Sequence, residues 1–282
     1  MVYVISLLIL LLTAAVGVIA IDSNRFVVHT VTISDSKIKE PLDLLFISDL
    51  HSKKYGKENK RLITALSEIK CDGAVLAGDM MTAHKDADFT EAVRTVRFLS
   101  SRMPVFYSMG NHETRAKENR AVYKDLYDRY LSSVEGGELT FLDNESAEFK
   151  GIDIKGLSIP RRFYKKTKHF DLPVSDIQTL VGERDDSKFC LLLAHDPEYF
   201  DGYADYGADL VLSGHFHGGI VRLFGHGLIS PRFTLFPKYS GGLYKKKNTR
   251  MLVNCGLGSH TIPWRMFNPG EVIILKLKPT DL

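Results

Sequence analysis

Short apolar runs that stop abruptly at polar residues recur along this chain. Runs of this length are typical of strands buried on both faces of a parallel sheet. Because the carboxyl ends of such strands form ligand sites in open α/β sheets, we expect the polar residues that follow them to come together. Five runs are followed within four residues by Asp, His or Asn: Leu42–Ile47 before Asp49 and His51, Gly73–Ala77 before Asp79, Pro104–Met109 before Asn111 and His112, Phe189–Ala194 before His195, and Asp209–Ser213 before His215 and His217.

Glycine stands directly before three of these polar residues, as Gly78, Gly110 and Gly214. A glycine can adopt a positive φ and lets the backbone turn closely under a ligand. The pattern therefore predicts tight turns that deliver side chains into a site at the sheet edge.

Helical spacing of apolar residues separates the first strands. It predicts helices over Glu58–Ile69, Phe89–Leu99 and Ala121–Leu131. The first of these has the position of a crossover between two parallel strands. The order is strand, helix, strand, helix, strand, which indicates an α/β fold.

Shorter alternating runs predict further strands. An edge strand is expected over Arg25–Ser34, before the first buried run. After Gly136 and Gly137, antiparallel strands are expected over Leu139–Leu142, Ala147–Phe149 and Ile152–Leu157, and two more strands over Met251–Asn254 and Glu271–Leu277.

The N-terminal segment Val2–Ile21 carries no charged side chain. About 20 apolar residues suffice to cross a bilayer as a helix. A cleaved secretory signal ending near Ala20 is the alternative, but no Lys or Arg precedes the apolar run, as such signals require. We therefore favour a retained single-pass anchor in the cell membrane. Arg25, Lys37 and Lys39 follow the span and favour a cytoplasmic position for the rest of the chain.

Composition places the remainder in the ordinary globular class. The 282 residues are 44% hydrophobic and 25% charged, with a net charge of +3. Such a small charge gives no indication of nucleic acid as a partner, and no protein partner is implied. We expect an anchor at residues 1–22, a connecting strand or linker at 23–41, and one globular domain at 42–282. Cys71, Cys190 and Cys255 are predicted to be core thiols rather than a disulfide framework or a zinc cluster.

The polar residues at the five strand ends resemble the motifs of the calcineurin-like metallophosphoesterase superfamily. All five blocks occur in the family order, and the resemblance covers roughly Leu42 to Leu277. The segments His217–Gly219, Phe236–Tyr244 and Asn254–Gly258 are similar to a bacterial branch of membrane-associated phosphohydrolases. That branch includes enzymes acting on UDP-diacylglucosamine. The resemblance implies an α/β sandwich of mixed sheets flanked by helices.

Oxygen and nitrogen ligands without a thiolate suit Mn, Fe, Zn or Ni, and a set of seven side chains suits two divalent ions. The resemblance assigns Asp49, His51 and His217 to the first ion, Asn111, His195 and His215 to the second, and Asp79 to both as a bridge. Such a pair lowers the pKa of a shared water, and the hydroxide attacks phosphorus in line. Manganese is the ion we expect first.

His112 follows the ligand Asn111 and by the family pattern lies near the leaving group. We expect it to protonate the leaving oxygen or to stabilise transition-state charge, with Asp79 or Asp49 orienting its ring. Glu113 is expected either to bind a nearby water or to cap the next helix. The histidines outside the series, which are His29, His84, His169, His226 and His260, are interpreted as structural or surface residues.

Two other segments have open interpretations. The basic segment Arg161–His169 suits anionic headgroups or a phosphate-rich substrate, although a solvated loop is the simpler interpretation. The stretch Gly218–Tyr244 suits either a substrate-facing rim or an irregular structural loop. Lys245–Lys247 is predicted to lie at a hairpin tip.

The sequence favours a membrane-anchored phosphohydrolase. Its expected substrate is a phosphorylated small molecule or a lipid-linked phosphodiester, phosphomonoester or pyrophosphate. A non-catalytic metal-binding scaffold of the same fold is an alternative, but a decayed site would lack ligands and this series is complete. A metal-dependent nuclease is disfavoured by the anchor and the small net charge.

Overall fold

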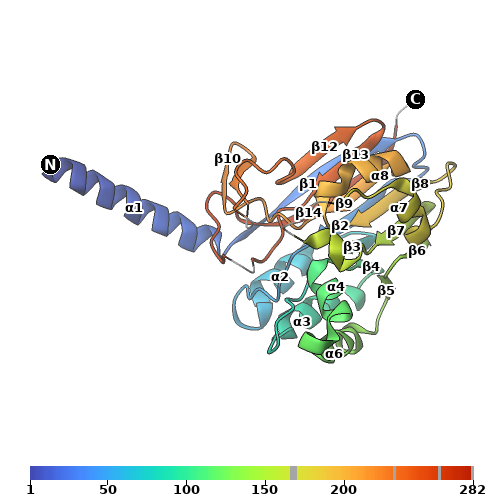
Figure 1. Cartoon of the computed structure of the whole chain (residues 1–282), viewed down its shortest axis with the longest axis horizontal. Helices are drawn as coiled ribbons and strands as arrows, with labels where there is room; N and C mark the ends of the chain where they lie inside the picture. Colours follow the sequence, from blue (N-terminus) through green and yellow to red (C-terminus); the bar gives the residue numbers. More distant parts are fainter. Residues whose placement is uncertain (166–169, 231–232, 260–261, 281–282) are drawn as a thin grey trace.

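The computed structural model describes residues 1–165, 170–230, 233–259 and 262–280. In these residues two six-stranded mixed sheets face each other, and helices cover the outer face of each (Figure 1). The strand order is β1-β14-β2-β3-β4-β5 in the first sheet and β12-β13-β9-β8-β7-β6 in the second, with a separate hairpin β10-β11. The architecture is the predicted α/β sandwich.

The first sheet holds three of the five buried runs. Its strands are β1 (Phe26–Asp35), β14 (Gly270–Pro279), β2 (Leu42–Ile47), β3 (Gly73–Ala77), β4 (Val105–Ser108) and β5 (Leu139–Leu142). Its outer face is covered by α2 (Lys60–Glu68), α3 (Thr90–Ser100) and α6 (Leu126–Val134), with α4 (Asn111–Glu118) and α5 (Arg120–Tyr123) leading into α6. Leu45 and Ile47 pack with these helices, whereas Leu44 and Phe46 pack against the other sheet. Burial on both faces explains why the run is apolar throughout.

The second sheet repeats this plan. Its strands are β12 (Gly242–Lys246), β13 (Thr249–Val253), β9 (Leu210–Ser213), β8 (Phe189–Ala194), β7 (Ile152–Leu157) and β6 (Glu145–Phe149). Leu191 and Leu193 of β8 face the first sheet, and Cys190 and Leu192 face α7 (Val174–Val181) and α8 (Phe200–Tyr206). The remaining elements are the hairpin strands β10 (Val221–Leu223) and β11 (His226–Ile229) and the 3-10 turns η1 (Lys57–Asn59), η2 (Arg161–Tyr164) and η3 (Pro197–Tyr199).

The five runs with polar ends do not share one sheet edge. β2, β3 and β4 belong to the first sheet, and β8 and β9 belong to the second. The site therefore forms where the carboxyl ends of two packed sheets meet, and the expectation of a single edge was wrong. Since a buried strand is equally apolar in either sheet, its sequence pattern does not reveal its neighbours.

Two further expectations need correction. The helix expected over residues 121–131 is broken, because Lys124 takes a φ of 52° between α5 and α6. The strand Leu139–Leu142 pairs parallel to β4 instead of antiparallel. By contrast, β6 and β7 pair antiparallel as expected, and β12 and β13 form a hairpin whose tip lies at residues 247–248.

The N-terminal helix α1 (Val2–Asp22) projects away from the domain (Figure 1). Its 21 residues span about 32 Å at 1.5 Å per residue, and the helix is long and apolar enough to cross a membrane. The expected edge strand follows it as β1, which pairs with β14 in parallel over its full length. The segment after the helix is thus part of the first sheet.

All three cysteines are free. Cys190 and Cys255 are buried, and Cys71 is half-buried. Burial raises the pKa of the Cys190 and Cys255 thiols to about 12 and that of Cys71 to about 11. These are unreactive thiols and not a zinc cluster.

The two sheets approach each other closely where β7 passes the end of β5. Gly156 of β7 lies against the end of β5, and a Cβ at this position would overlap the carbonyl oxygen and the Cβ of Leu142. Overpacking of this kind costs about 1–3 kcal/mol, and at this size each kcal/mol lowers Tm by about 2–4 °C. We expect Gly156→Ala to lower Tm by roughly 3–10 °C in a thermal melt. The exposed neighbour on β6 provides the control, Ser146→Ala, and equal Tm values for both variants would contradict this account.

Candidate functional site

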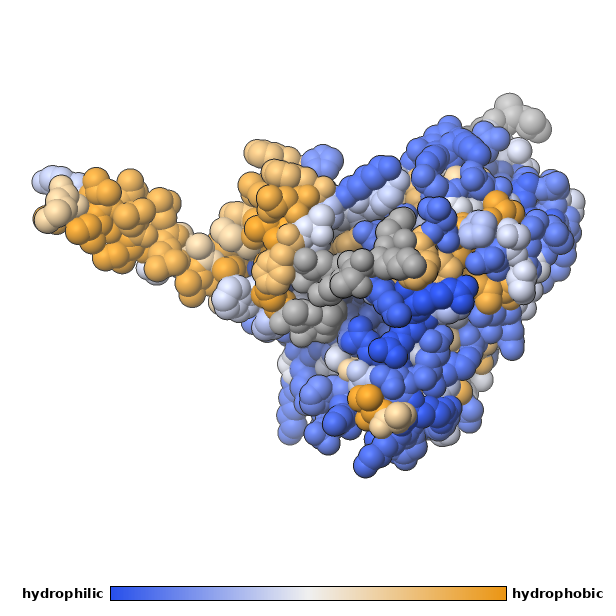
Figure 2. All heavy atoms as spheres, in the orientation of Figure 1, coloured by the Kyte–Doolittle hydropathy of each residue, from blue (hydrophilic) through white to orange (hydrophobic). Residues whose placement is uncertain are grey.

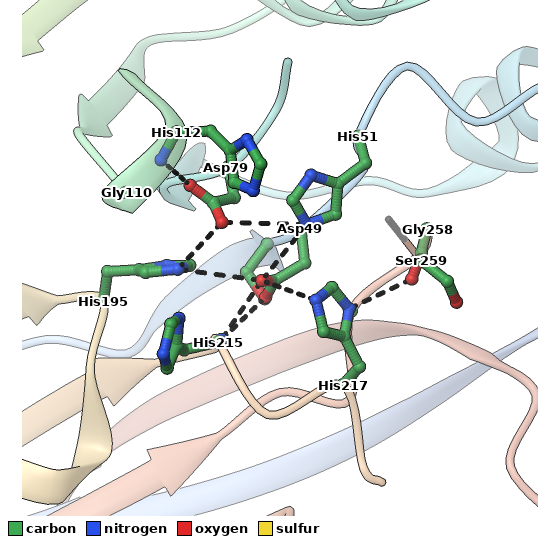
Figure 3. Close-up of polar contacts among 12 residues, drawn as sticks. Asp49, His51, Asp79, Gly110, His112, His195, His215, His217, Gly258 and Ser259 are labelled. Atoms are coloured by element: carbon green, nitrogen blue, oxygen red, sulfur yellow. Dashed lines mark hydrogen bonds and ion pairs between the residues drawn. The ribbon is translucent and has the colours of Figure 1, made fainter. Parts of the chain in front are cut away.

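Two buried aspartates lie at the centre of the predicted site, with imidazoles around them (Figure 3). Asp49 follows β2 and Asp79 follows β3. His195 comes from the end of β8, and His215 and His217 follow β9. His195 Nε2 lies 3.2 Å from Asp79 Oδ2 and 3.8 Å from Asp49 Oδ1. His51 Nε2 lies 3.7 Å from Asp79 Oδ2, so residues far apart in sequence converge on one volume.

Asp49 is held by its immediate surroundings. Ser48 Oγ donates to Asp49 Oδ2 at 2.6 Å, and the His215 backbone N–H donates to both carboxylate oxygens at 3.1 Å. Burial raises the pKa of Asp49 to about 6, while the charge of His195 acts in the opposite direction. An ionised Asp49 in this dry interior therefore requires positive charge beside it.

The pKa of Asp79 shifts in the opposite direction from that of Asp49. Burial acts to raise its pKa, but the charges of His195 and His112 outweigh burial and hold the pKa well below its usual value. Burial likewise acts to lower the pKa of His195, and Asp79 and Asp49 together raise it to about 10. A proton on His195 Nε2 thus occupies the place between the carboxylates that a cation would take.

Three imidazoles turn the same nitrogen into the site. His195 Nδ1–H donates to the Ala77 carbonyl at 2.7 Å, and His217 Nδ1–H donates to the Gly258 carbonyl at 3.1 Å. His51 Nδ1 lies 3.3 Å from Thr82 Oγ1. With Nδ1 directed outward in each ring, Nε2 faces the aspartates. Outer hydrogen bonds of this kind orient histidine ligands at metal sites.

The side-chain amide of Asn111 lies within hydrogen-bond distance of three atoms of the site. These are Asp79 Oδ2 at 3.1 Å, His195 Nε2 at 3.3 Å and His215 Nδ1 at 2.7 Å. The donor set therefore fits a divalent ion among Asp79, Asn111, His195 and His215.

The residues expected to hold the other ion also lie close together. Ligand atoms of Asp49, His51 and His217 lie within 4.8 Å of one another, as do those of Asp79, His195 and His215. The structure thus brings together all seven predicted ligands, and their oxygen and nitrogen donors fit two divalent ions. Their individual roles stay a prediction.

The ligand turns carry backbone strain that the sequence pattern did not predict. Five of the seven candidate ligands have positive φ: Asp49 (49°), His51 (47°), Asp79 (54°), His215 (72°) and His217 (52°). A backbone conformation of this kind costs about 1–3 kcal/mol per residue. It persists only where the surrounding structure holds the residue in place, and it is common at active sites. Of the preceding glycines, Gly78 has the expected positive φ of 82°, whereas Gly110 and Gly214 are required by close contacts. A Cβ on Gly214 would overlap Asp49 Oδ2, and one on Gly110 would overlap Asp79 Oδ1.

His112 lies beside His51, with ring centroids 4.8 Å apart. Its Nδ1 accepts from the Ala83 N–H at 2.8 Å, so the neutral ring carries its proton on Nε2. Asp79 Oδ1 accepts from the backbone N–H of His112 at 2.7 Å, and the orientation of the ring by a carboxylate stays a prediction. His112 also lies close enough to His51 and Asp79 to join a metal site.

Glu113 caps the next helix, which was one of its two expected roles. Its carboxylate also accepts hydrogen bonds from the turn after β3 and from a tyrosine. It accepts from Gly110 N–H at the start of α4, from Asp79 N–H and Met80 N–H, and from Tyr107 O–H at 2.7 Å. Burial, more than the nearby charge of Asp79, raises the pKa of Glu113 to about 7. Glu113 therefore joins the β3 and β4 turns.

Three supporting residues were missed at the sequence level. Asp196, buried directly after His195, has Oδ2 3.7 Å from His215 Nε2. Arg265 donates to the carbonyl of Gly258, which also accepts from His217, and to the carbonyls of Cys255 and Gly256. Asn268 Nδ2 donates to the carbonyls of His217 at 2.7 Å and Gly219 at 2.6 Å. The one available signal was Asp196, because it directly follows a predicted ligand.

Of the histidines outside the series, His29, His84 and His226 are exposed. His169 and His260 lie outside the described residues, as does part of the basic segment, residues 166–169. Tyr164, in the described part of that segment, places its ring centroid 5.8 Å from that of His215. One end of the basic segment therefore reaches the site.

Comparison with known proteins agrees with this geometry. The sequence profile of the calcineurin-like phosphoesterases matches residues 42–219, well over half of the chain. An uncharacterized metallophosphoesterase of Helicobacter pylori is 28% identical over 87% of this chain and 62% of its own length. The Bacillus subtilis metallophosphoesterase YkuE is 28% identical over 89% of this chain and 85% of its own.

A zebrafish (Danio rerio) protein named as a transmembrane protein with a metallophosphoesterase domain is 23% identical over 88% of this chain and 56% of its own. The chain spans about three-fifths of the length of the Helicobacter relative. The profile match and the gathered ligands lead to one conclusion: the chain belongs to the calcineurin-like phosphoesterases.

Proposed function

We propose that this phosphoesterase is anchored in the cell membrane and uses two divalent ions, manganese foremost, to hydrolyse a lipid-linked substrate. The bond cleaved is a phosphodiester, phosphomonoester or pyrophosphate bond. The observation that carries a dinuclear centre is the convergence of two ligand groups, Asp49, His51 and His217 in one and Asp79, His195 and His215 in the other, each with its ligand atoms within 4.8 Å of one another.

The chain's own residues divide the work. Asp49, His51 and His217 would hold one ion, Asn111, His195 and His215 would hold the other, and Asp79 would serve both. Bound there, the ions supply a water-derived nucleophile at neutral pH and neutralise charge on the phosphoryl group. His112 presents Nε2–H beside this centre, where it donates a proton to the leaving oxygen.

The membrane part of the proposal is supported by α1, which is exposed over its length and apolar enough to span a bilayer. An anchor confines the site near the bilayer and so raises its effective concentration towards a lipid-linked substrate. A nuclease would be expected to carry a strongly basic surface, and the net charge is only +3. A lipid-linked phosphate therefore suits this chain better.

Metal content and activity should disappear together. After exhaustive chelation we expect no hydrolysis of a chromogenic phosphodiester, and reconstitution with Mn²⁺ should restore activity with about two ions per chain by elemental analysis. As the pH falls, the retained metal should decrease, because protons compete with the ions for the lone pairs of Asp49 and the histidine ligands. Full activity in chelated protein would refute the metal mechanism.

His112 and Asp79 should respond differently to substitution. Asp79→Ala removes a ligand shared by both sites, so metal content and turnover should fall together. His112→Ala should keep the metal and slow turnover by roughly 10²–10⁴-fold, as is usual for a general acid. Elemental analysis and kcat are measured on the same samples. Loss of metal in His112→Ala would instead make His112 a ligand.

The anchor should matter only for membrane-borne substrate. A truncated protein beginning at Ser23 keeps β1 and the hydrogen bond from Arg265 N–H to Ser23 Oγ. It should hydrolyse a soluble diester about as fast as the full chain. On a lipid-linked pyrophosphate in vesicles it should be at least about ten-fold slower, a modest share of what tethering gives. Equal rates on every vesicle substrate would remove the main support for lipid specificity.

A further inference from the structure

Exposed apolar side chains gather on the domain beside the end of α1. Figure 2 shows this apolar surface over the β10 region, next to the apolar helix. Its members, which we call the aromatic patch, are Leu223, Phe224, Trp264 and Phe267, with exposures of 38, 98, 59 and 50%. Phe233, Leu235 and Phe236 add exposed apolar surface in the loop after β11. Aromatic clusters of this size on a soluble surface mark a partner or a membrane.

Backbone hydrogen bonds hold the patch together and attach it to the anchor. Met266 N–H donates to the Ile220 carbonyl and Arg222 N–H donates to the Met266 carbonyl, so the Trp264–Phe267 segment runs beside β10. Arg265 N–H donates to Ser23 Oγ at 3.0 Å, one residue after α1. The patch and the end of α1 are therefore one continuous surface.

The exposed phenylalanines carry a backbone cost that packing does not offset. Phe224 has a φ of 50° and Phe267 a φ of 56°, a region that bulky residues rarely adopt. Because both side chains are largely exposed, the folded domain gains little burial in return. Backbone outliers of this kind cluster at active sites, ligand-contacting segments and switch regions.

Basic residues also lie beside the end of α1. Arg61 donates to the Asn24 carbonyl, and Lys53 Nζ lies 3.4 Å from Asn24 Oδ1. Lys54, Lys57 and Lys60 are exposed in the same segment, which contains one acidic residue, Glu58. Burial and the charges of Arg265 and Arg61 lower the pKa of Lys53, as expected in a cluster of cations.

We propose that the aromatic patch and the basic segment Lys53–Arg61 form a second membrane contact that docks the domain on an anionic bilayer. This inference rests on the membrane location proposed above and adds a defined orientation to it. A bilayer is the occupant that matches the surface, because aromatic side chains and Lys or Arg favour the interface and the surface continues directly from a spanning helix.

Docking would fix the metal site relative to the lipid headgroups. Asn268, which follows the patch residue Phe267, binds the carbonyls of His217 and Gly219. Arg265, which follows Trp264, binds the carbonyl of Gly258 that accepts from His217. The segment that would touch the bilayer is therefore bonded to the loop of a metal ligand, which favours substrates whose phosphate lies at headgroup level.

Trp264 is the one tryptophan of the chain and provides a native probe. The full chain is reconstituted in phosphatidylcholine vesicles with 30% phosphatidylglycerol, with and without lipids brominated near the headgroup. We expect brominated lipid to quench Trp264 emission at least about two-fold. The double variant Phe224→Ser, Phe267→Ser should lose most of this quenching, and omission of phosphatidylglycerol should weaken it. Val122→Ser, an exposed apolar residue on α5, is the matched control and should quench as the natural chain does.

Co-sedimentation with the vesicles separates this proposal from the anchor itself. If the double variant sediments fully but quenches as the natural chain does, the anchor stands and the docking surface is wrong. Emission that responds to the protein-to-lipid ratio and not to bromination would mean that a second copy covers the face, which also overturns the proposal. Failure of the natural chain to sediment would overturn both the docking and the membrane location.

Discussion

Two carboxylates in a dry interior impose the constraint on which the site depends. Asp49 and Asp79 lie with their oxygens turned towards imidazole nitrogens and the side-chain amide of Asn111. Such a set of lone pairs is stable only with positive charge among them, whether protons or metal ions. The surrounding structure fixes the outer atoms of these side chains, as the Ala77 and Gly258 carbonyls do for His195 and His217. The site is therefore organised for cations before any substrate arrives.

The same constraint explains the relation between the sheets. A ligand set drawn from one sheet edge would lie along a line of parallel strands, spaced about 4.8 Å apart. Here β2 and β3 supply the carboxylates, and β8 and β9 approach them from the second sheet with three histidines. Ligands from two directions enclose a volume. Gly214, after β9, allows this closeness, because a Cβ at this position would overlap Asp49 Oδ2.

The sequence predicted these elements to different degrees, for physical reasons. Buried strands such as β2 are recognisable because both faces exclude water, and ligand residues are recognisable because polar side chains there have no packing role. Strand pairing is not local, so the insertion of β14 between β1 and β2 had no sequence signal. The break at Lys124 was equally hidden, since lysine favours helices.

Supporting residues were hardest to recognise, because their role depends on segments that only the fold brings together. Arg265 resembles a solvated loop residue in sequence, yet it is 2% exposed and bound to several carbonyls. Its segment faces two ways: Arg265 and Asn268 point inward to the His217 loop, and Trp264 and Phe267 point outward. If α1 were connected to the domain only through a few unbonded residues, the domain could rotate freely relative to the helix. Because this segment bonds both to Ser23 and to the ligand loop, the orientation of the metal site follows the orientation of the surface beside α1.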